Sequence, residues 1–414
     1  MTALFRKLRT ALQNPTTSVS PLPLDIVDVI LEELRHEKIA LDSCSLVCRA
    51  WTHYSRPHRF SETIIVHRAK LVKLLRLLDS PHCTLRPYLR SMTVDQTERG
   101  RCAWIESFFA LIRRKDIALR ELTIPSFTTG LNVAFLRSGI VPLRSLHLNV
   151  KGCSVEETMQ FVCLFCDTLE SLALRGCSTI GPSTYSQSEW RRAYPSCHFP
   201  HLRKFHIEGV QWMTGYMEWF RQFAALEVLS SLYLSFGYFD DPCRIGDGIS
   251  HTDVDFYVAS FLANACGAVE ILTLDYDWSS PISRLDLSTL PRLYRLSVIW
   301  HGRASADVAT LATLMSSARM SALSGIHLSN FDFEGGLKKA SIATAWSRLD
   351  AALSRTHPAL FPCLRNVEVS PARLLALLPG CRRTVNVRSG RTSRKIAWSF
   401  PWKQVAWIAP YEGA

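Results

Sequence analysis

One phrase, Leu-x-x-Leu-x-Leu with Ile, Val, Phe or Met tolerated, returns ten times between residues 89 and 369. The fourth and sixth residues of each copy are apolar and alternate with other residues, which is the period of a short strand with one inward face. Successive copies begin 24 to 41 residues apart, which leaves room for a helix between strands. The copies begin at Leu89, Leu119, Leu143, Leu169, Leu202, Leu229, Val269, Leu293, Leu323 and Leu364.

Segments with the apolar spacing of amphipathic helices lie between many of these strands. They cover residues 71–78, 104–114, 155–165, 253–265, 304–317 and 338–353. A strand followed by a helix, repeated, stacks into a curved solenoid with a parallel sheet on its concave side. The phrases resemble those of leucine-rich repeat proteins, although only Asn149 and Asn330 stand where that family carries an Asn ladder. We predict an α/β fold with an irregular leucine-rich-repeat solenoid over residues 63–380. The alternative is an ordinary α/β domain.

A short helical segment precedes the repeats. Pro23 suits the first turn of a helix, and Asp25 and Asp28 place negative charge at the positive end of its dipole. Apolar residues then recur at three- and four-residue steps, and a second helical run leads to Trp51. A hairpin this small cannot bury so many apolar groups alone, so we expect it to dock on a partner. Periodicity by itself also fits an ordinary core hairpin.

The residue string of this segment resembles the F-box, a helical module that binds a Skp-type adaptor within cullin-based ubiquitin ligases. Asp25 stands where that family often has Glu. The family pattern is occupied by Leu22, Pro23, Ile26, Ile30, Leu31, Leu41, Cys44, Leu46, Val47, Cys48, Arg49 and Trp51.

The resemblance implies an F-box over residues 21–62 that contacts the adaptor through its apolar side chains. Replacing Ile30 and Leu31 with Asp is predicted to abolish adaptor binding and to leave the solenoid folded, because two charges would enter an apolar contact. The predicted adaptor contacts are Leu22, Pro23, Ile26, Ile30, Leu31, Leu34, Leu41, Val47, Cys48 and Trp51.

Residues between the inward leucines are expected to project from the concave sheet. They are mixed in charge and include few large apolar groups, which suits recognition of a polar protein surface. Tyr233, Arg175 and Arg295 are the expected anchors, because aromatic residues and Arg dominate binding hot spots. The predicted contacts to a target protein are His147, Arg175, Lys204, His206, Tyr233, Asp275 and Arg295.

The net charge of +12 is concentrated at the two ends of the chain. Residues 1–20 are predicted to form a basic flexible extension, with a mitochondrial transit peptide as the alternative. Residues 381–414 are predicted to form a basic, aromatic cap or tail. Between them the chain is nearly neutral, so we expect no nucleic-acid groove on the solenoid.

Two observations bear on the compartment. Apolar runs such as Phe161–Cys166 are far shorter than the roughly 18 residues of a membrane span, so no transmembrane segment is expected. Thirteen cysteines without a secretory signal peptide favour an intracellular chain with reduced thiols, in the cytoplasm, the nucleus or both.

Patterns that carry enzyme chemistry are missing from the sequence, and we predict no cofactor or metal. Cys163 and Cys166 have a metal or redox spacing but fall in an apolar helical run, so we interpret them as buried structural cysteines. Gly335–Lys339 lacks the order of a phosphate loop. The acidic segment 239–255 matches no calcium loop, and we interpret it as a solvated loop, with a binding element as the alternative.

Together these features predict a non-catalytic substrate receptor of a cullin-type ubiquitin ligase. The F-box would dock the Skp-type adaptor, and through it a cullin, while the solenoid holds an unknown target protein. Ubiquitin transfer would be carried out by the partners, and this chain is expected to be a monomer within the hetero-complex. The alternative is an interaction scaffold that uses the same F-box and repeats outside any ligase.

Overall fold

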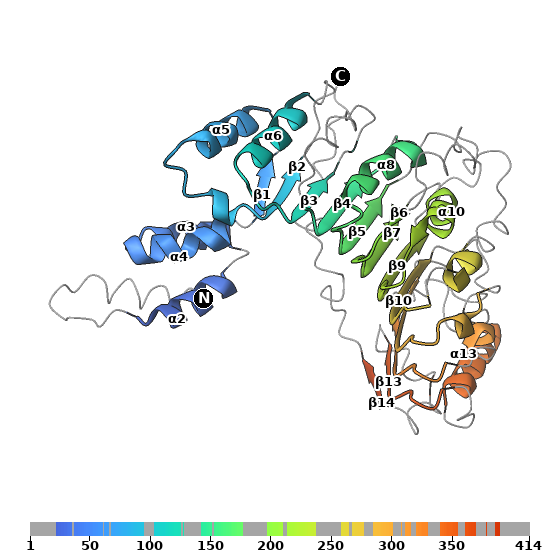
Figure 1. Cartoon of the computed structure of the whole chain (residues 1–414). Coiled ribbons are helices and arrows are strands. Elements are labelled where there is room, and N and C mark those ends of the chain that lie inside the picture. The colour runs from blue at the N-terminus through green and yellow to red at the C-terminus, as the bar shows by residue number, and fades with distance from the viewer. Residues whose placement is uncertain are drawn as a thin grey trace, which may run out of the picture.

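The computed structural model of the 414-residue chain consists of a small helical module followed by a curved parallel sheet with helices on its outer side (Figure 1). It describes residues 22–34, 37–60, 62–65, 68–94, 103–125, 127, 142–150, 153–176, 197–209, 213–236, 258–264, 267–276, 285–300, 308, 311–315, 320–329, 340–354, 361–369, 378 and 386–389.

The helical module contains α2 (Leu24–Glu33), α3 (Lys38–Ser45) and α4 (Arg49–Phe60). Pro23 is the N-cap of α2, and Asp25 lies in its first turn, as the sequence predicts. The three helices enclose a small core of their own, which among the described side chains is separate from the core of the repeats. This core consists of Val27, Leu31, Leu34, Leu41 and Cys44.

A 12-stranded parallel sheet forms the body of the protein. Ten of its strands are the ten predicted phrases, so the leucine-rich-repeat solenoid is confirmed. The sheet also has a further strand at each end, β1 and β14. The strands are β1 (Glu62–Ile65), β2 (Ser91–Val94), β3 (Glu121–Ile124), β4 (Ser145–Asn149), β5 (Ser171–Arg175), β7 (Lys204–Glu208), β9 (Ser231–Phe236), β10 (Ile271–Tyr276), β11 (Arg295–Trp300), β12 (Gly325–Ser329), β13 (Asn366–Val369) and β14 (Asn386–Ser389).

The helices that follow the strands cover the outer face of the sheet, as α8, α10 and α13 show in Figure 1. The predicted helix over residues 155–165 is divided, because the α-helix ends at Val162 and a 3-10 turn continues it. Residues 258–264 are helical as well. The remaining elements are α5 (Arg68–Asp79), η1 (Arg86–Tyr88), α6 (Ala103–Arg114), α8 (Val155–Val162), η2 (Cys163–Phe165), α10 (Met213–Phe223), η5 (Leu287–Thr289), α13 (Ala340–Leu353) and a two-stranded sheet of β6 (Cys197–His198) and β8 (Ala224–Ala225).

The register of the sheet places like residues side by side. Leu146 pairs with Leu172 and Leu148 with Leu174, so the inward leucines form continuous rows beneath the helices. These rows are fully buried, and burial of each such side chain stabilises the fold by about 1.5–3 kcal/mol. The residues between them lie on the opposite, concave face.

Close packing between α8 and α10 depends on a glycine. A side chain at Gly215 would place its Cβ 3.0 Å from Val155 Cγ2, so glycine lets the two helices approach. The neighbouring Tyr216 is fully buried and donates a hydrogen bond to Thr158 Oγ1 at 3.1 Å.

Several predicted segments lie outside the described residues: the extension 1–20, the acidic segment 239–255, Gly335–Lys339 and the aromatic part of the C-terminal tail. Among the helices that are described, none is both long and apolar enough to span a bilayer.

Candidate functional site

The predicted adaptor contacts divide into two groups in the helical module. Leu31, Leu34 and Leu41 are buried in the module's own core, and Ile30 and Trp51 pack against that core from its edge. These residues hold the helices together rather than form a free surface. A charge at Leu31 would therefore disrupt the module itself, so the predicted Ile30 and Leu31 double substitution is not a selective test of docking.

The second group is exposed. Leu22, Pro23 and Ile26 lie at the start of α2, while Val47 and Cys48 lie in the turn between α3 and α4. Leu46, in the same turn, is 86% exposed. These side chains give the module an apolar surface that the described chain does not cover.

Sequence reasoning missed Leu24, Val29 and Ile39 as exposed apolar residues, and Ile39 is 85% exposed. The helical period gives a signal for Val29. Val27 and Leu31 are four residues apart and face the core, and Val29 is displaced from Val27 by about 200°, at roughly 100° per residue. Ile26, three residues before Val29, shares that outer side.

Polar side-chain contacts join the three helices of the module. His58 of α4 lies between two carboxylates of α2, with Nε2 3.3 Å from Asp28 Oδ1 and Nδ1 3.3 Å from Glu32 Oε2. Arg59 Nε contacts Asp42 Oδ1 of α3 at 2.7 Å. Helix α4 is thus tied to both of its neighbours by its last turn.

The concave face carries a connected polar cluster at its centre, which we call the concave cluster: Arg175, His206, Glu208, Tyr233 and Asp275. Arg175 Nη2 lies 3.1 Å from Glu208 Oε1, and His206 Nε2 lies 3.2 Å from Glu208 Oε2. The His206 and Tyr233 rings stack at 4.0 Å, and the Tyr233 hydroxyl donates to Asp275 Oδ2 at 2.5 Å. Four of the predicted contacts to a target protein therefore lie side by side, and Glu208 connects two of them, Arg175 and His206.

Burial and charge set the protonation states in this region. Burial raises the pKa of the Glu208 carboxyl, but the hydrogen bond from His206 and the charge of Arg175 outweigh it, so the net pKa is lowered. Burial and the nearby Asp275 carboxylate raise the pKa of Tyr233, which stays a neutral donor. Glu208 is thus an anion with a cationic partner, and the cluster presents both charges to a ligand.

His147 lies deeper than predicted. It is 2% exposed, and its Nε2 contacts Ser145 Oγ at 2.8 Å and Glu121 Oε1 at 3.5 Å. Burial, and secondarily repulsion from His206, lower its pKa to about 3. We therefore regard the His147 ring as neutral in its contact with Glu121. We assign His147 a structural role within the sheet.

The remaining two predicted contacts lie apart from the cluster. Lys204 is exposed at the start of β7. Arg295, on β11, reaches across β12 to Glu368 on β13, with Nη2 4.0 Å from Oε2. The concave face therefore offers separate charged positions suited to a polar partner surface.

Comparison with known proteins gives only weak structural similarities. No protein-family model matches this chain, and no match to its sequence was found among curated proteins. Among solved structures, the leucine-rich repeat-containing protein LegL7 from Legionella pneumophila is 15% identical, with 77% of this chain and 97% of that chain covered and a TM-score of 0.44. A chain of the Rad7 and Elc1 complex in yeast is 13% identical, with 94% and 92% covered and a TM-score of 0.34. At these scores neither protein informs the function of this chain.

Proposed function

We propose that this protein is a substrate receptor of a cullin-type ubiquitin ligase. Its helical module acts as an F-box that docks a Skp-type adaptor, and its concave sheet binds a target protein. The chain itself contributes no catalytic group and acts by bringing the target close to the ligase-bound ubiquitin.

The exposed apolar side chains of the module support this role most directly. Ile26 and Val47 occupy F-box pattern positions, and both point away from the module's core. A small module that leaves several large apolar side chains exposed is a candidate interaction site. A Skp-type adaptor is the partner that the residue string indicates.

The concave cluster supports the second half of the proposal. Arg175 and Glu208 are each about one-third exposed, at 33% and 30%, so they are accessible as well as paired. Tyr233 is held by Asp275 and by the His206 ring, which gives an aromatic anchor with little freedom to lose on binding. Such a surface fits a polar protein segment better than an apolar ligand.

The test is capture of a purified Skp-type adaptor by the full chain and by two single variants, Ile26→Asp and Val47→Asp. Each variant places a charge in the proposed apolar contact, so we expect adaptor affinity to fall at least tenfold. Thermal unfolding is expected to stay unchanged, because both side chains are exposed.

Val228→Asp is the matched control. Val228 is 41% exposed and Val47 is 45% exposed, so the same substitution is made at similar exposure, but on the solenoid. The control is expected to bind the adaptor as the unmodified chain does. Unchanged adaptor affinity in both module variants would refute the docking surface. Capture of adaptor without cullin from cells would favour the scaffold over the ligase receptor.

A further inference from the structure

Three cysteine thiols meet on the helical side of the solenoid, and neither the proposed adaptor surface nor the concave cluster uses them. Cys163 begins η2, Cys166 follows it, and Cys197 comes from β6. Cys163 Sγ lies 3.2 Å from Cys197 Sγ, across 34 positions of sequence. Cys166 is close enough to Cys197 to influence its pKa, and the Cys166 thiol contacts Asp167 Oδ1 at 3.6 Å. The sequence offered only the Cys163 and Cys166 pair.

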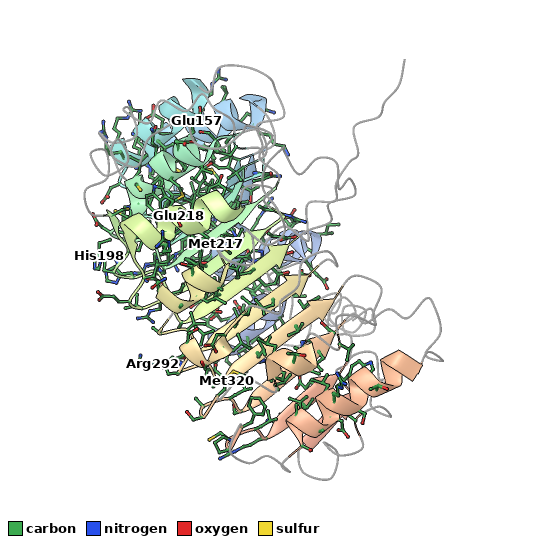
Figure 2. The ribbon with its side chains drawn as sticks, turned by 90° about the vertical axis from the view of Figure 1, so that its right-hand side faces the viewer. Glu157, His198, Met217, Glu218, Arg292 and Met320 are labelled. Carbon is green, nitrogen blue, oxygen red and sulfur yellow. The ribbon has the colours of Figure 1, made fainter. Side chains whose placement is uncertain are left out.

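Two elements of fixed position bring these thiols together. A reciprocal capping box between Ser154 and Glu157 fixes the start of α8, the helix that leads into Cys163. Strand β6 pairs with β8, which directly follows α10. Figure 2 shows α8 and α10, marked by Glu157 and Glu218, on the same face, with His198 of β6 at its edge. The contact therefore joins two consecutive repeats.

The thiols also differ in exposure. Cys163 and Cys166 are half-buried, which corrects their interpretation as buried cysteines, whereas Cys197 is buried. A small oxidant can therefore reach Cys163 from solvent more readily than it can reach Cys197. This is the arrangement in which an oxidised sulfur is trapped by a neighbouring thiol.

We propose that Cys163 and Cys197 are a redox modification site that forms a reversible disulfide with peroxide as the oxidant. Peroxide transfers one oxygen atom to Cys163 Sγ, which gives a sulfenic acid and one water. Cys197 Sγ then attacks that sulfur, the S–O bond breaks, and the leaving hydroxide takes the Cys197 proton to become a second water. A dithiol reductant returns both thiols.

The surroundings predict a slow reaction at neutral pH. A hydrogen bond with Cys163, followed by burial, raises the pKa of the Cys197 thiol, although its bond with Cys166 opposes this shift. Its bond with Cys197 and its burial raise the pKa of Cys166 as well. Because the thiolate is the reactive form, the rate of disulfide formation is expected to increase toward alkaline pH.

A metal site fits the geometry less well. Zinc–thiolate bonds of about 2.3 Å in tetrahedral geometry hold two ligand sulfurs about 3.8 Å apart, which is wider than the observed thiol contact. Among the residues that the structure describes, no group of three or more His, Cys, Asp and Glu side chains is arranged to hold a metal ion.

Oxidation would have a defined structural consequence. The disulfide would connect the end of α8 and η2 to β6 and would enclose β5, the strand that carries Arg175 of the concave cluster. It would therefore restrain one repeat from the outer side without adding any group to the concave face. A disulfide that bridges this many residues also removes freedom from the unfolded chain.

The test uses the full chain treated with hydrogen peroxide, followed by blocking of free thiols, trypsin digestion and mass spectrometry. We expect the peptides Gly152–Arg175 and Ala193–Arg203 to be joined, with a mass lower by two hydrogen atoms than their sum. Fragmentation must assign the bond to Cys163, because Cys153 and Cys166 lie on the same peptide. Dithiothreitol should separate the peptides again.

Cys163→Ser and Cys197→Ser should each lose the joined peptides, whereas Cys166→Ser and the exposed Cys363→Ser should retain them. If a variant does not fold, the disulfide mapping of the unmodified chain still tests the proposal. A bond from Cys197 to Cys153 or Cys166, no joined peptide at any pH, or one tightly bound zinc per chain in the purified protein would overturn the proposal.

Discussion

Leu31→Ala tests whether the helical module and the solenoid are energetically separate. Leu31 is fully buried in a core of five described side chains, and within the described part of the chain this core does not merge with the core of the repeats. Losing three buried carbons costs about 2.4 kcal/mol, at about 0.8 kcal/mol per group. The unfilled cavity adds to this, and measured costs of such substitutions are about 2–5 kcal/mol.

A loss of about 3 kcal/mol increases the equilibrium constant for opening of the module roughly a hundredfold, since every 1.4 kcal/mol is tenfold. Hydrogen exchange measured by mass spectrometry reads each element separately. Amides of α2 and α4 are expected to lose about two orders of magnitude of protection, while those of β9 to β11 stay unchanged. The exposed Val29→Ala is the control, with an expected effect within about 0.5 kcal/mol.

An equal loss of protection in the repeats would show that the two cores unfold together, which would refute the separation. Unchanged protection in α2 would show that Leu31 does not hold the module. Adaptor binding gives a second readout, because apparent affinity falls with the fraction of folded module. Leu31→Ala should therefore weaken adaptor binding only as far as it lowers the folded fraction of the module, whereas Ile26→Asp should weaken binding with the module intact.

Two further predictions concern the solenoid. The neutral His147, with a pKa of about 3, remains unprotonated in the folded chain while the unfolded chain takes up a proton below its ordinary value of 6.5. The free energy of unfolding should therefore fall as pH drops from about 6.5 to about 3, with up to about 1.4 kcal/mol per pH unit from this residue. Denaturant titrations should show a smaller pH slope for His147→Gln but the original slope for the exposed His201→Gln. Ser154→Ala removes both hydrogen bonds that depend on the Ser154 side chain at the start of α8, and a lower denaturation midpoint, equivalent to about 1 kcal/mol, is expected.

The repeat strands could be predicted because their inward positions are almost all Leu, Ile or Val. Within each phrase these positions have the same spacing, although the phrases themselves begin at varying distances from one another. The end strands could not. The segment Glu62–Ile65 lacks the leading leucine of the phrase, and Asn386–Ser389 contains a single apolar residue, Val387. Both strands depend on pairing with a neighbour, which is a tertiary effect that no local pattern reports.

Helix α10 could not be predicted from the sequence, for a different reason. Its apolar residues are mainly aromatic, and Gly215 interrupts it near its start. Glycine disfavours a helix in isolation by about 1 kcal/mol relative to alanine, so the local signal is weak. Tertiary packing nevertheless favours glycine here, because the absence of a side chain at Gly215 leaves room for Val155 of α8. Tertiary context therefore decides this element.

The candidate sites show the same division between local pattern and tertiary arrangement. Alternation along β7 places His206 and Glu208 on the concave face, but only the register of the sheet brings Arg175 and Tyr233 beside them. Likewise, F-box spacing marks Leu31 and Ile26 alike. Only the packing of α4 against α2 makes Leu31 interior and leaves Ile26 outside.

The junction between the two cores bears on the proposed receptor role. Helix α4 contacts β1 and η1, and Arg56 Nη1 donates to Thr84 Oγ1 at 3.1 Å. Because the described side chains of the module and of the repeats form separate cores, we expect these contacts to set the orientation of the proposed adaptor surface relative to the concave sheet. A receptor that works by proximity depends on that orientation as much as on either binding surface, since a target held in the wrong direction is bound but not reached.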